Sequence, residues 1–153
     1  TVTAGNASGI NDGACAMVVT TAKYAKEHGL KPVARVLAVE SKGVPAEVMG
    51  IGPAYVIPKA IEKAGLTADA IDYYEINEAF APVVIDAVQT LGLDWAKVNP
   101  NGSAMALGHP LGATGGVLAC KALSELERIN GKYAMVAMCA AIGHGGAAIY
   151  ERY

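Results

Sequence analysis

Three short segments of the chain combine side chains that carry out acid–base chemistry with small residues that let a ligand approach. The first is Asn77-Glu78-Ala79-Phe80, where a short predicted strand gives way to a helical pattern. The simplest interpretation makes Asn77 the N-cap of that helix and Glu78 a first-turn acid favoured by the helix dipole. The functional alternative is that Asn77 presents its amide at the carboxyl edge of a sheet, where α/β proteins bind ligands.

The second segment is the glycine-rich stretch 101–116, in which His109 stands between Gly108 and Pro110. Small residues allow backbone and ligand to approach closely, and the neighbours of His109 constrain its backbone at a helix entrance. A lone histidine is often only a structural residue. The sequence therefore leaves a structural and a catalytic interpretation of His109 open.

The third segment begins at Cys139, at the end of an apolar run, and continues through the glycine cluster 143–146. A cysteine in this position is commonly part of an inert core. The glycine-rich turn offers backbone N–H groups near the sulfur, which can lower the pKa of a thiol or bind an oxyanion. No role is indicated for His144 in the same turn.

The composition favours one domain and excludes several classes of protein. The chain has 153 residues, 53% of them apolar and 6% aromatic, which suits tight packing of helices on a sheet. A net charge of −2 gives no basic field for nucleic acid or a membrane surface, and no apolar run approaches the ~20 residues of a membrane span. Three scattered cysteines indicate free thiols in an intracellular, cytoplasmic location, and no zinc pattern predicts a bound metal.

Apolar periodicity and glycine or proline stops predict alternating strands and helices. This order is typical of an α/β layered domain, and we expect a mixed, mainly parallel five-stranded sheet covered by helices. A short connection joins the last two strands, so they should be antiparallel. The predicted strands are 14–20, 33–39, 72–76, 133–140 and 146–150, and the predicted helices are 21–28, 55–64, 78–91 and 111–128.

Four motifs in order resemble the thiolases, the acetyl-CoA acetyltransferases and 3-ketoacyl-CoA thiolases. They are the loop 3–14, the segment 49–53, Asn77-Glu78-Ala79-Phe80 and the segment 108–113, and Cys139 stands where the family has its second catalytic cysteine. Each motif alone is weak, but their order and intervals are specific. The resemblance implies that residues 1–153 form a thiolase C-terminal domain, whose N-terminal, nucleophile-bearing domain lies outside this chain.

The resemblance implies acyl transfer between acyl-CoA thioesters, by Claisen condensation or by thiolytic cleavage of 3-ketoacyl-CoA. His109 would activate a nucleophilic cysteine of the N-terminal half and help bind a thioester oxygen. Asn77 would hold the water that completes this oxyanion hole, and Cys139 would move the α-proton of acetyl-CoA. Acyl-CoA would be a substrate, with no permanently bound cofactor, and the intact enzyme would be a homo-oligomer. The residues placed along the substrate are Ala4, Ser8, Met49, Ala79, Phe80, Ala141 and Gly143.

The sequence departs from the family at two positions. Ala141 replaces the glycine of the usual Cys-x-Gly; alanine keeps the N–H donor, but a positive φ there would be costly. His144 stands where the family tends to have an apolar side chain. No cysteine has the context of a nucleophile, so we expect the chain alone to be inactive and to expose the apolar face that meets its partner. Alternatives are a CoA-binding module without chemistry, half of another condensing enzyme such as a ketoacyl synthase, and a plain structural domain.

Overall fold

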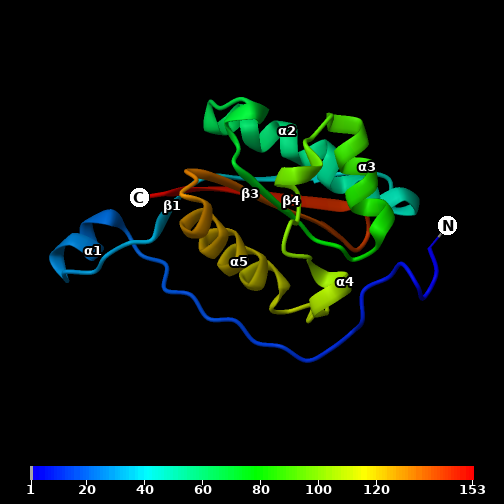
Figure 1. Cartoon of the computed structure of the whole chain (residues 1–153), viewed down its shortest axis with the longest axis horizontal. Coiled ribbons are helices and arrows are strands. Elements are labelled where there is room, and N and C mark those ends of the chain that lie inside the picture. The colour runs from blue at the N-terminus through cyan, green and yellow to red at the C-terminus, as the bar shows by residue number, and fades with distance from the viewer. Residues whose placement is uncertain (1) are drawn as a thin grey trace.

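The computed structural model describes residues 2–153, and its body is a sheet between two groups of helices (Figure 1). One face of the sheet is covered by α2 and α3, and the other by α5. The strands are β1 (Ala34–Gly43), β2 (Tyr73–Ile76), β3 (Tyr133–Ala140) and β4 (His144–Arg152). The helices are α1 (Ala22–Glu27), α2 (Gly52–Ala64), α3 (Ala81–Leu91), α4 (Ala104–Leu107) and α5 (Thr114–Ile129). The α/β layered fold expected from the sequence is therefore confirmed.

The sheet differs from the expectation in strand number and direction. It has four strands in the order β1-β4-β3-β2, so the prediction of five strands is wrong. The β3–β4 pair is antiparallel, as its short connection predicts, but β1–β4 is also antiparallel and β2–β3 alone is parallel. The sheet is thus mixed, and the prediction that it is mainly parallel is wrong.

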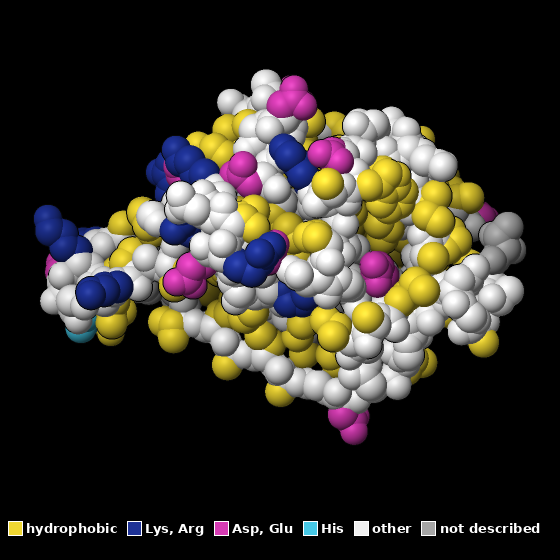
Figure 2. Space-filling model, viewed as in Figure 1, with side chains coloured by type: hydrophobic (Ala, Val, Ile, Leu, Met, Phe, Trp, Pro, Cys, Tyr) yellow, Lys and Arg dark blue, Asp and Glu magenta, His cyan; other side chains and the backbone are white. Residues whose placement is uncertain are grey.

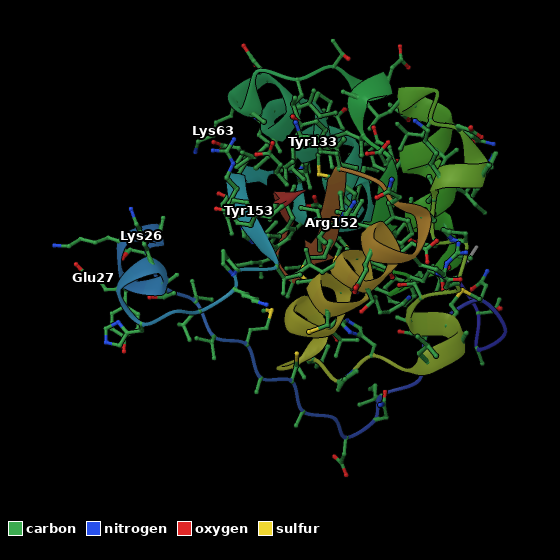
Figure 3. The ribbon with its side chains drawn as sticks, turned by 60° about the vertical axis from the view of Figure 1, so that its left-hand side comes forward. Lys26, Glu27, Lys63, Tyr133, Arg152 and Tyr153 are labelled. Carbon is green, nitrogen blue, oxygen red and sulfur yellow. The ribbon has the colours of Figure 1, made fainter. Side chains whose placement is uncertain are left out.

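The fifth predicted strand, 14–20, is an extended segment that joins no sheet in the described part of the chain. An apolar run becomes a strand only when a neighbouring backbone supplies hydrogen bonds. Val18 and Val19 instead remain 88% and 83% exposed. In Figure 1 the segment runs below α5 and leads to α1, which carries Lys26 and Glu27 away from the body (Figure 3). Figure 2 shows hydrophobic side chains gathered along this lower side of the molecule.

Local sequence sets the bounds of α2. The helix begins at Gly52, with Pro53 in its first turn, and ends at Gly65 in the left-handed conformation, φ +67°. Because it starts three residues before the predicted 55, Pro58 lies inside the helix, where it has no N–H for an intrahelical hydrogen bond. Val56, Ile57 and other buried residues of α2 form the main core against β1, β3 and β4.

Of the helices in the described part of the chain, none combines the length and apolarity that a bilayer crossing requires.

Candidate active site

Asn77 is placed by the buried strand that it follows. All four residues of β2 are buried, and the N–H of Asn77 continues the ladder by donating to the carbonyl of Ala137 in β3 (2.8 Å). The next helix, α3, begins at Ala81 after Phe80, so the interpretation of Asn77 as its N-cap is wrong. Asn77 instead sits fully buried at the carboxyl edge shared by the parallel strands β2 and β3.

The free edge of β2 is held by Asn99. Its side-chain oxygen accepts from the N–H of Ile76 and its amide nitrogen donates to the carbonyl of Ile76, both at 2.8 Å. One side chain therefore satisfies two backbone groups of an edge strand, as a neighbouring strand would. These two hydrogen bonds from Asn99 fix the backbone of Ile76, one residue before Asn77.

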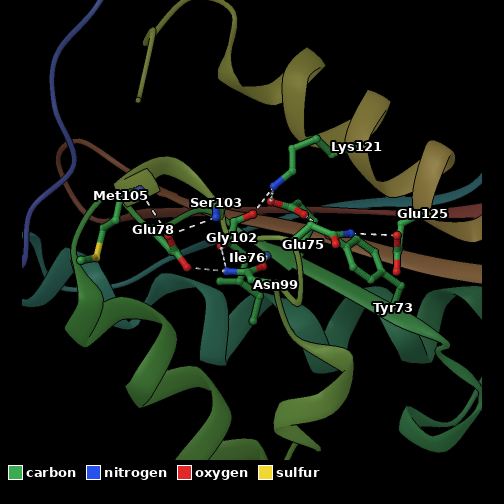
Figure 4. Close-up of polar contacts among 11 residues, drawn as sticks. Tyr73, Glu75, Ile76, Glu78, Asn99, Gly102, Ser103, Met105, Lys121 and Glu125 are labelled. Atoms are coloured by element: carbon green, nitrogen blue, oxygen red, sulfur yellow. Dashed lines mark hydrogen bonds and ion pairs between the residues drawn. The ribbon is translucent and has the colours of Figure 1, made fainter. Parts of the chain in front are cut away.

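Glu78 caps a helix, but not the one that follows it in sequence. Its carboxylate accepts from the backbone N–H groups of Ser103 and Met105, each at 3.2 Å, and from Asn99 (3.3 Å; Figure 4). Ser103 precedes α4, so the carboxylate stabilises the N-terminus of that helix. The expectation that Glu78 is a first-turn acid of the following helix is wrong, and Glu78 instead ties the end of β2 to the loop leading to His109.

The surroundings of His109 determine which ring nitrogen carries a proton. Its Nδ1 lies 2.7 Å from Oγ1 of Thr114, and that hydroxyl donates its proton to the carbonyl of Pro110 (2.9 Å). Since the hydroxyl proton is already used, Nδ1 must be the donor, and Nε2 is left with a lone pair. This Nε2 lies 3.4 Å from Nδ2 of Asn77. Burial lowers the pKa of His109, which favours the neutral imidazole.

Cys139 lies near the end of β3, beside the segment that follows Asn77. The side chain is 6% exposed and packs with Ala79 and Val83, against which Met49 and Phe80 also pack. Burial raises the pKa of the Cys139 thiol, and only its own backbone amide acts in the opposite direction. The possibility that the backbone N–H groups of the glycine-rich turn lower this pKa is therefore wrong for the chain as it stands.

Two of the residues expected along the substrate lie on the N-terminal segment. The N–H and hydroxyl of Ser8 both donate to the carbonyl of Ala79, at 3.0 and 3.1 Å. Ser8 is thus fixed next to the Cys139 group. Ala4 lies in an exposed turn, where the N–H of Asn6 donates to the carbonyl of Thr3 (3.1 Å).

In the turn after β3, the positive φ falls on a residue other than the expected one. Ala141 is exposed and is absent from the positive-φ residues, whereas Ile142 has φ +59° and Gly143 has φ +83°. The carbonyl of Gly143 accepts from the N–H of Val44 (2.8 Å), and a Cβ on this glycine would overlap the Val44 carbonyl oxygen. The hydrogen bond to Gly143 therefore joins the turn to the chain after β1. The strain of a positive φ, which we expected at Ala141, lies at Ile142 instead.

The structure thus brings Asn77 and His109 into contact and sets Cys139 beside Ala79 and Phe80. A neutral imidazole, an amide and a thiol at one sheet edge can accept a proton, donate hydrogen bonds and return a proton. The sequence analysis missed Thr114, which orients His109. Its position five residues after the histidine, at the start of a helix, is the signal that could have found it.

The layered α/β fold and the acid–base residues at the shared edge of β2 and β3 define this chain as an α/β domain with a candidate catalytic site. One family model matches the chain. The model of the thiolase C-terminal domain matches residues 30–152, and the chain belongs to this family. The beta-ketothiolase BktB of Cupriavidus necator is 52% identical over 152 residues. The beta-ketoadipyl-CoA thiolase of Pseudomonas aeruginosa is 48% identical over 154 residues. These matches cover 99% of the chain but only 39% and 38% of the two relatives.

Solved structures agree with the sequence comparison. The acetyl-CoA acetyltransferase of Bacillus anthracis matches with a TM-score of 0.96 and 42% identity, over 99% of this chain and 39% of that one. The human mitochondrial 3-ketoacyl-CoA thiolase in complex with CoA matches with a TM-score of 0.91 and 38% identity, over 99% of this chain and 39% of that one. The chain therefore spans about two fifths of the length of these proteins.

Proposed function

We propose that the chain is the catalytic C-terminal half of a thiolase, which acts on acyl-CoA together with an N-terminal half that supplies a nucleophilic cysteine. The observation that carries the proposal is the contact between Nδ2 of Asn77 and the lone-pair nitrogen of His109, 3.4 Å apart. A base and a hydrogen-bond donor held side by side can serve the two steps of acyl transfer. The two longer relatives from Cupriavidus necator and Pseudomonas aeruginosa, both named thiolases, support the requirement for a second half.

In the first step, Nε2 of His109 takes the proton of the partner's thiol, whose sulfur attacks the acyl carbon and expels coenzyme A as a thiolate; this thiolate takes the proton of Cys139. In the second step, Nε2 and a water held by Asn77 donate to the thioester oxygen of acetyl-CoA. The Cys139 thiolate removes the α-proton, and the resulting enolate attacks the carbonyl carbon of the acyl-enzyme. The bond from that carbon to the nucleophilic sulfur breaks, and the sulfur takes back its proton from Nε2 of His109. The reverse sequence cleaves 3-ketoacyl-CoA.

A thiolate at Cys139 requires surroundings that the chain alone does not provide. Burial raises the pKa of Cys139 here, so binding of the N-terminal half or of substrate has to favour the ionised form. The backbone N–H groups of Ala141 and Gly143, in the turn after the strand, are the donors that we assign to the oxyanion of the acyl-enzyme. This assignment makes proton transfer by Cys139 dependent on assembly.

The CoA moiety is assigned to the surface around Ala79. Ser8, which bonds to the Ala79 carbonyl, and Phe80 are the proposed contacts of the pantetheine chain, with Ala4 further along the same segment. Met49, packed against the Cys139 group, belongs to the neighbouring pocket. A structural neighbour solved in complex with CoA supports the choice of ligand.

The partner half would cover surface that is apolar here. Ile10, Val18, Val19 and Leu111 are between 70% and 91% exposed. Such a surface favours association, and we expect the intact enzyme to be a homo-oligomer. The free, exposed thiols of Cys15 and Cys120 support a reducing, cytoplasmic location.

The test is to join the chain to the N-terminal half of the Cupriavidus necator relative and to measure cleavage of acetoacetyl-CoA by CoA. We expect turnover by the joined protein and a loss of about 10²- to 10⁴-fold in His109→Ala, the usual contribution of a general base. His28→Ala, which changes an exposed residue directly after helix α1, is the matched control and should retain full activity. Normal rates in a folded His109→Ala protein would reject the role of His109. A joined protein that binds CoA but never turns over would instead favour a binding module.

A further inference from the structure

A small cavity lies between Asn77, the loop that ends in α4, and helix α5. Its volume is about 10 Å³, and Asn77, Ser103, Thr114, Leu118 and Lys121 are among the residues that line it. Neither His109 nor Cys139 belongs to the lining. A volume of about 10–15 Å³ is what a single water molecule needs, provided that polar groups surround it.

Two buried oxygens, on residues that line this cavity, have no hydrogen-bond partner among the described residues 2–153. They are Oδ1 of Asn77, in a residue that is 0% exposed, and Oγ of Ser103, in a residue that is 1% exposed. Leaving a buried acceptor or hydroxyl unpaired destabilises the folded state. Two such groups lining one cavity indicate a shared partner.

The hydroxyl of Ser103 is free for this purpose because another residue performs its usual task. Ser103 stands at the N-cap position of α4, where a serine side chain normally accepts from the first helical N–H groups. Here the side chain makes no such bond, and the carboxylate of Glu78 takes the N–H groups of Ser103 and Met105 instead (Figure 4).

Lys121 contributes a third polar group to the cavity. Its ammonium donates to Oε1 of Glu75 (2.8 Å) and to the carbonyl of Gly102 (Figure 4). An ammonium has three N–H donors, so one is left for the cavity that Lys121 lines.

We infer that this cavity binds one structural water molecule, held by Asn77, Ser103 and Lys121, and that Ser103 is a positioning residue for the amide of Asn77. The water donates to Oδ1 of Asn77, exchanges a hydrogen bond with Oγ of Ser103 and accepts from Nζ of Lys121. Three partners are the usual number for a buried water.

The consequence for the site is a fixed orientation of the Asn77 amide. With Oδ1 bound to the water, Nδ2 has to face His109, as the 3.4 Å contact requires. Without the water, the amide can turn over and present its oxygen to His109. The donor that the proposed function assigns to Asn77 would then be lost, so the kinetic part of this inference rests on that function.

The first experiment is independent of activity. It is a crystal structure, at a resolution that shows ordered waters, of the chain joined to an N-terminal thiolase half. We expect one water peak within hydrogen-bonding distance of Asn77 Oδ1, Ser103 Oγ and Lys121 Nζ, and we expect the same cavity in Ser103→Ala to lose that peak. A dry cavity in the unsubstituted protein overturns the inference, even if the enzyme is an active thiolase.

The second experiment measures kcat and KM in the joined enzyme. Ser103→Ala should lower kcat about 3- to 10-fold, the worth of one hydrogen bond, and leave KM for acetoacetyl-CoA unchanged. Ser103→Gly makes room for a second water in place of the hydroxyl and should recover most of the loss. The matched control is Ser124→Ala, which deletes an exposed hydroxyl on α5 and should have no effect. An unchanged kcat in Ser103→Ala, or Gly and Ala variants that are equally slow, overturns the positioning role.

Discussion

The hydroxyl of Thr114 lies 2.7 Å from Nδ1 of His109 and has its own proton committed to the carbonyl of Pro110. This relationship leaves Nε2 of His109 as the free base that faces Asn77. The orientation of the base thus depends on a residue in the first turn of the next helix. The N–H of His109, which donates to the carbonyl of Gly9 (3.0 Å), fixes the backbone from the other side.

Thr114→Val should reduce kcat in the joined enzyme about 3- to 10-fold, since it removes one hydrogen bond that selects the tautomer of His109. Thr114→Ser keeps the hydroxyl and should stay close to the original rate. The measurement is the steady-state rate of acetoacetyl-CoA cleavage. If the serine variant lost as much activity as the valine variant, the lost methyl contacts of the buried Thr114 would explain the effect instead of the hydroxyl.

His109 should titrate below its ordinary value of 6.5, because burial lowers its pKa. A group with a lowered folded-state pKa adds stability above the unfolded-state pKa and loses it as the pH falls through the folded-state pKa. The chain should therefore lose stability below about pH 6.5 through this group. NMR titration of the histidine ring protons measures the pKa. The signal that is absent from the spectrum of His109→Gln is the signal of His109. A value above 6.5 would contradict burial as the dominant effect.

Much of the fold could be predicted from local pattern. Strand-length patterns placed β1, β2 and β3 within a few residues, and a glycine stop placed the end of α2. The short connection predicted the antiparallel β3–β4 pair. The grouping of Asn77 with His109 was predicted from the order of motifs. That grouping joins residues 32 apart and followed from the family resemblance. The strands and helices depend on residues close in sequence, so periodicity and turn chemistry describe them.

The errors all concern partners that are distant in sequence. The run 14–20 has the apolar character of a strand, but no neighbouring strand pairs with it, and periodicity does not encode a neighbour. Glu78 has the position of a first-turn acid, yet its carboxylate reaches Ser103 and Met105, 25 and 27 residues away. The pKa of Cys139 was expected to fall because of nearby amides, whereas burial, which depends on the whole fold, raises it.

Lys121→Met should destabilise the chain more than any exposed charge deletion. The side chain of Glu75 is 0% exposed and that of Lys121 is 19% exposed, at an N–O distance of 2.8 Å. Removing the lysine leaves a buried, uncompensated carboxylate, which costs about 3–5 kcal/mol. Urea unfolding measures the change, and Lys23→Met, on α1 where Lys23 is 84% exposed, is the control. Adding Glu75→Gln to Lys121→Met should recover most of the loss, because it removes the charge; a double variant as unstable as Lys121→Met would contradict this account.

Ile142→Gly should stabilise the chain. Ile142 has φ +59° while its side chain is 90% exposed, so replacing it relieves backbone strain and sacrifices little burial. Left-handed backbone costs about 1–2 kcal/mol for a residue with a Cβ, and the added freedom of glycine when unfolded subtracts about 0.4–1 kcal/mol. A net gain of about 0.5–1 kcal/mol remains and should raise the Tm by a few degrees. Gly143→Ala is the matched comparison, since its Cβ would overlap the carbonyl of Val44 at φ +83°, and it should lower the Tm. Equal shifts of the same sign in both variants would show that the turn after β3 adapts to either residue, and that the positive φ of Ile142 carries no strain.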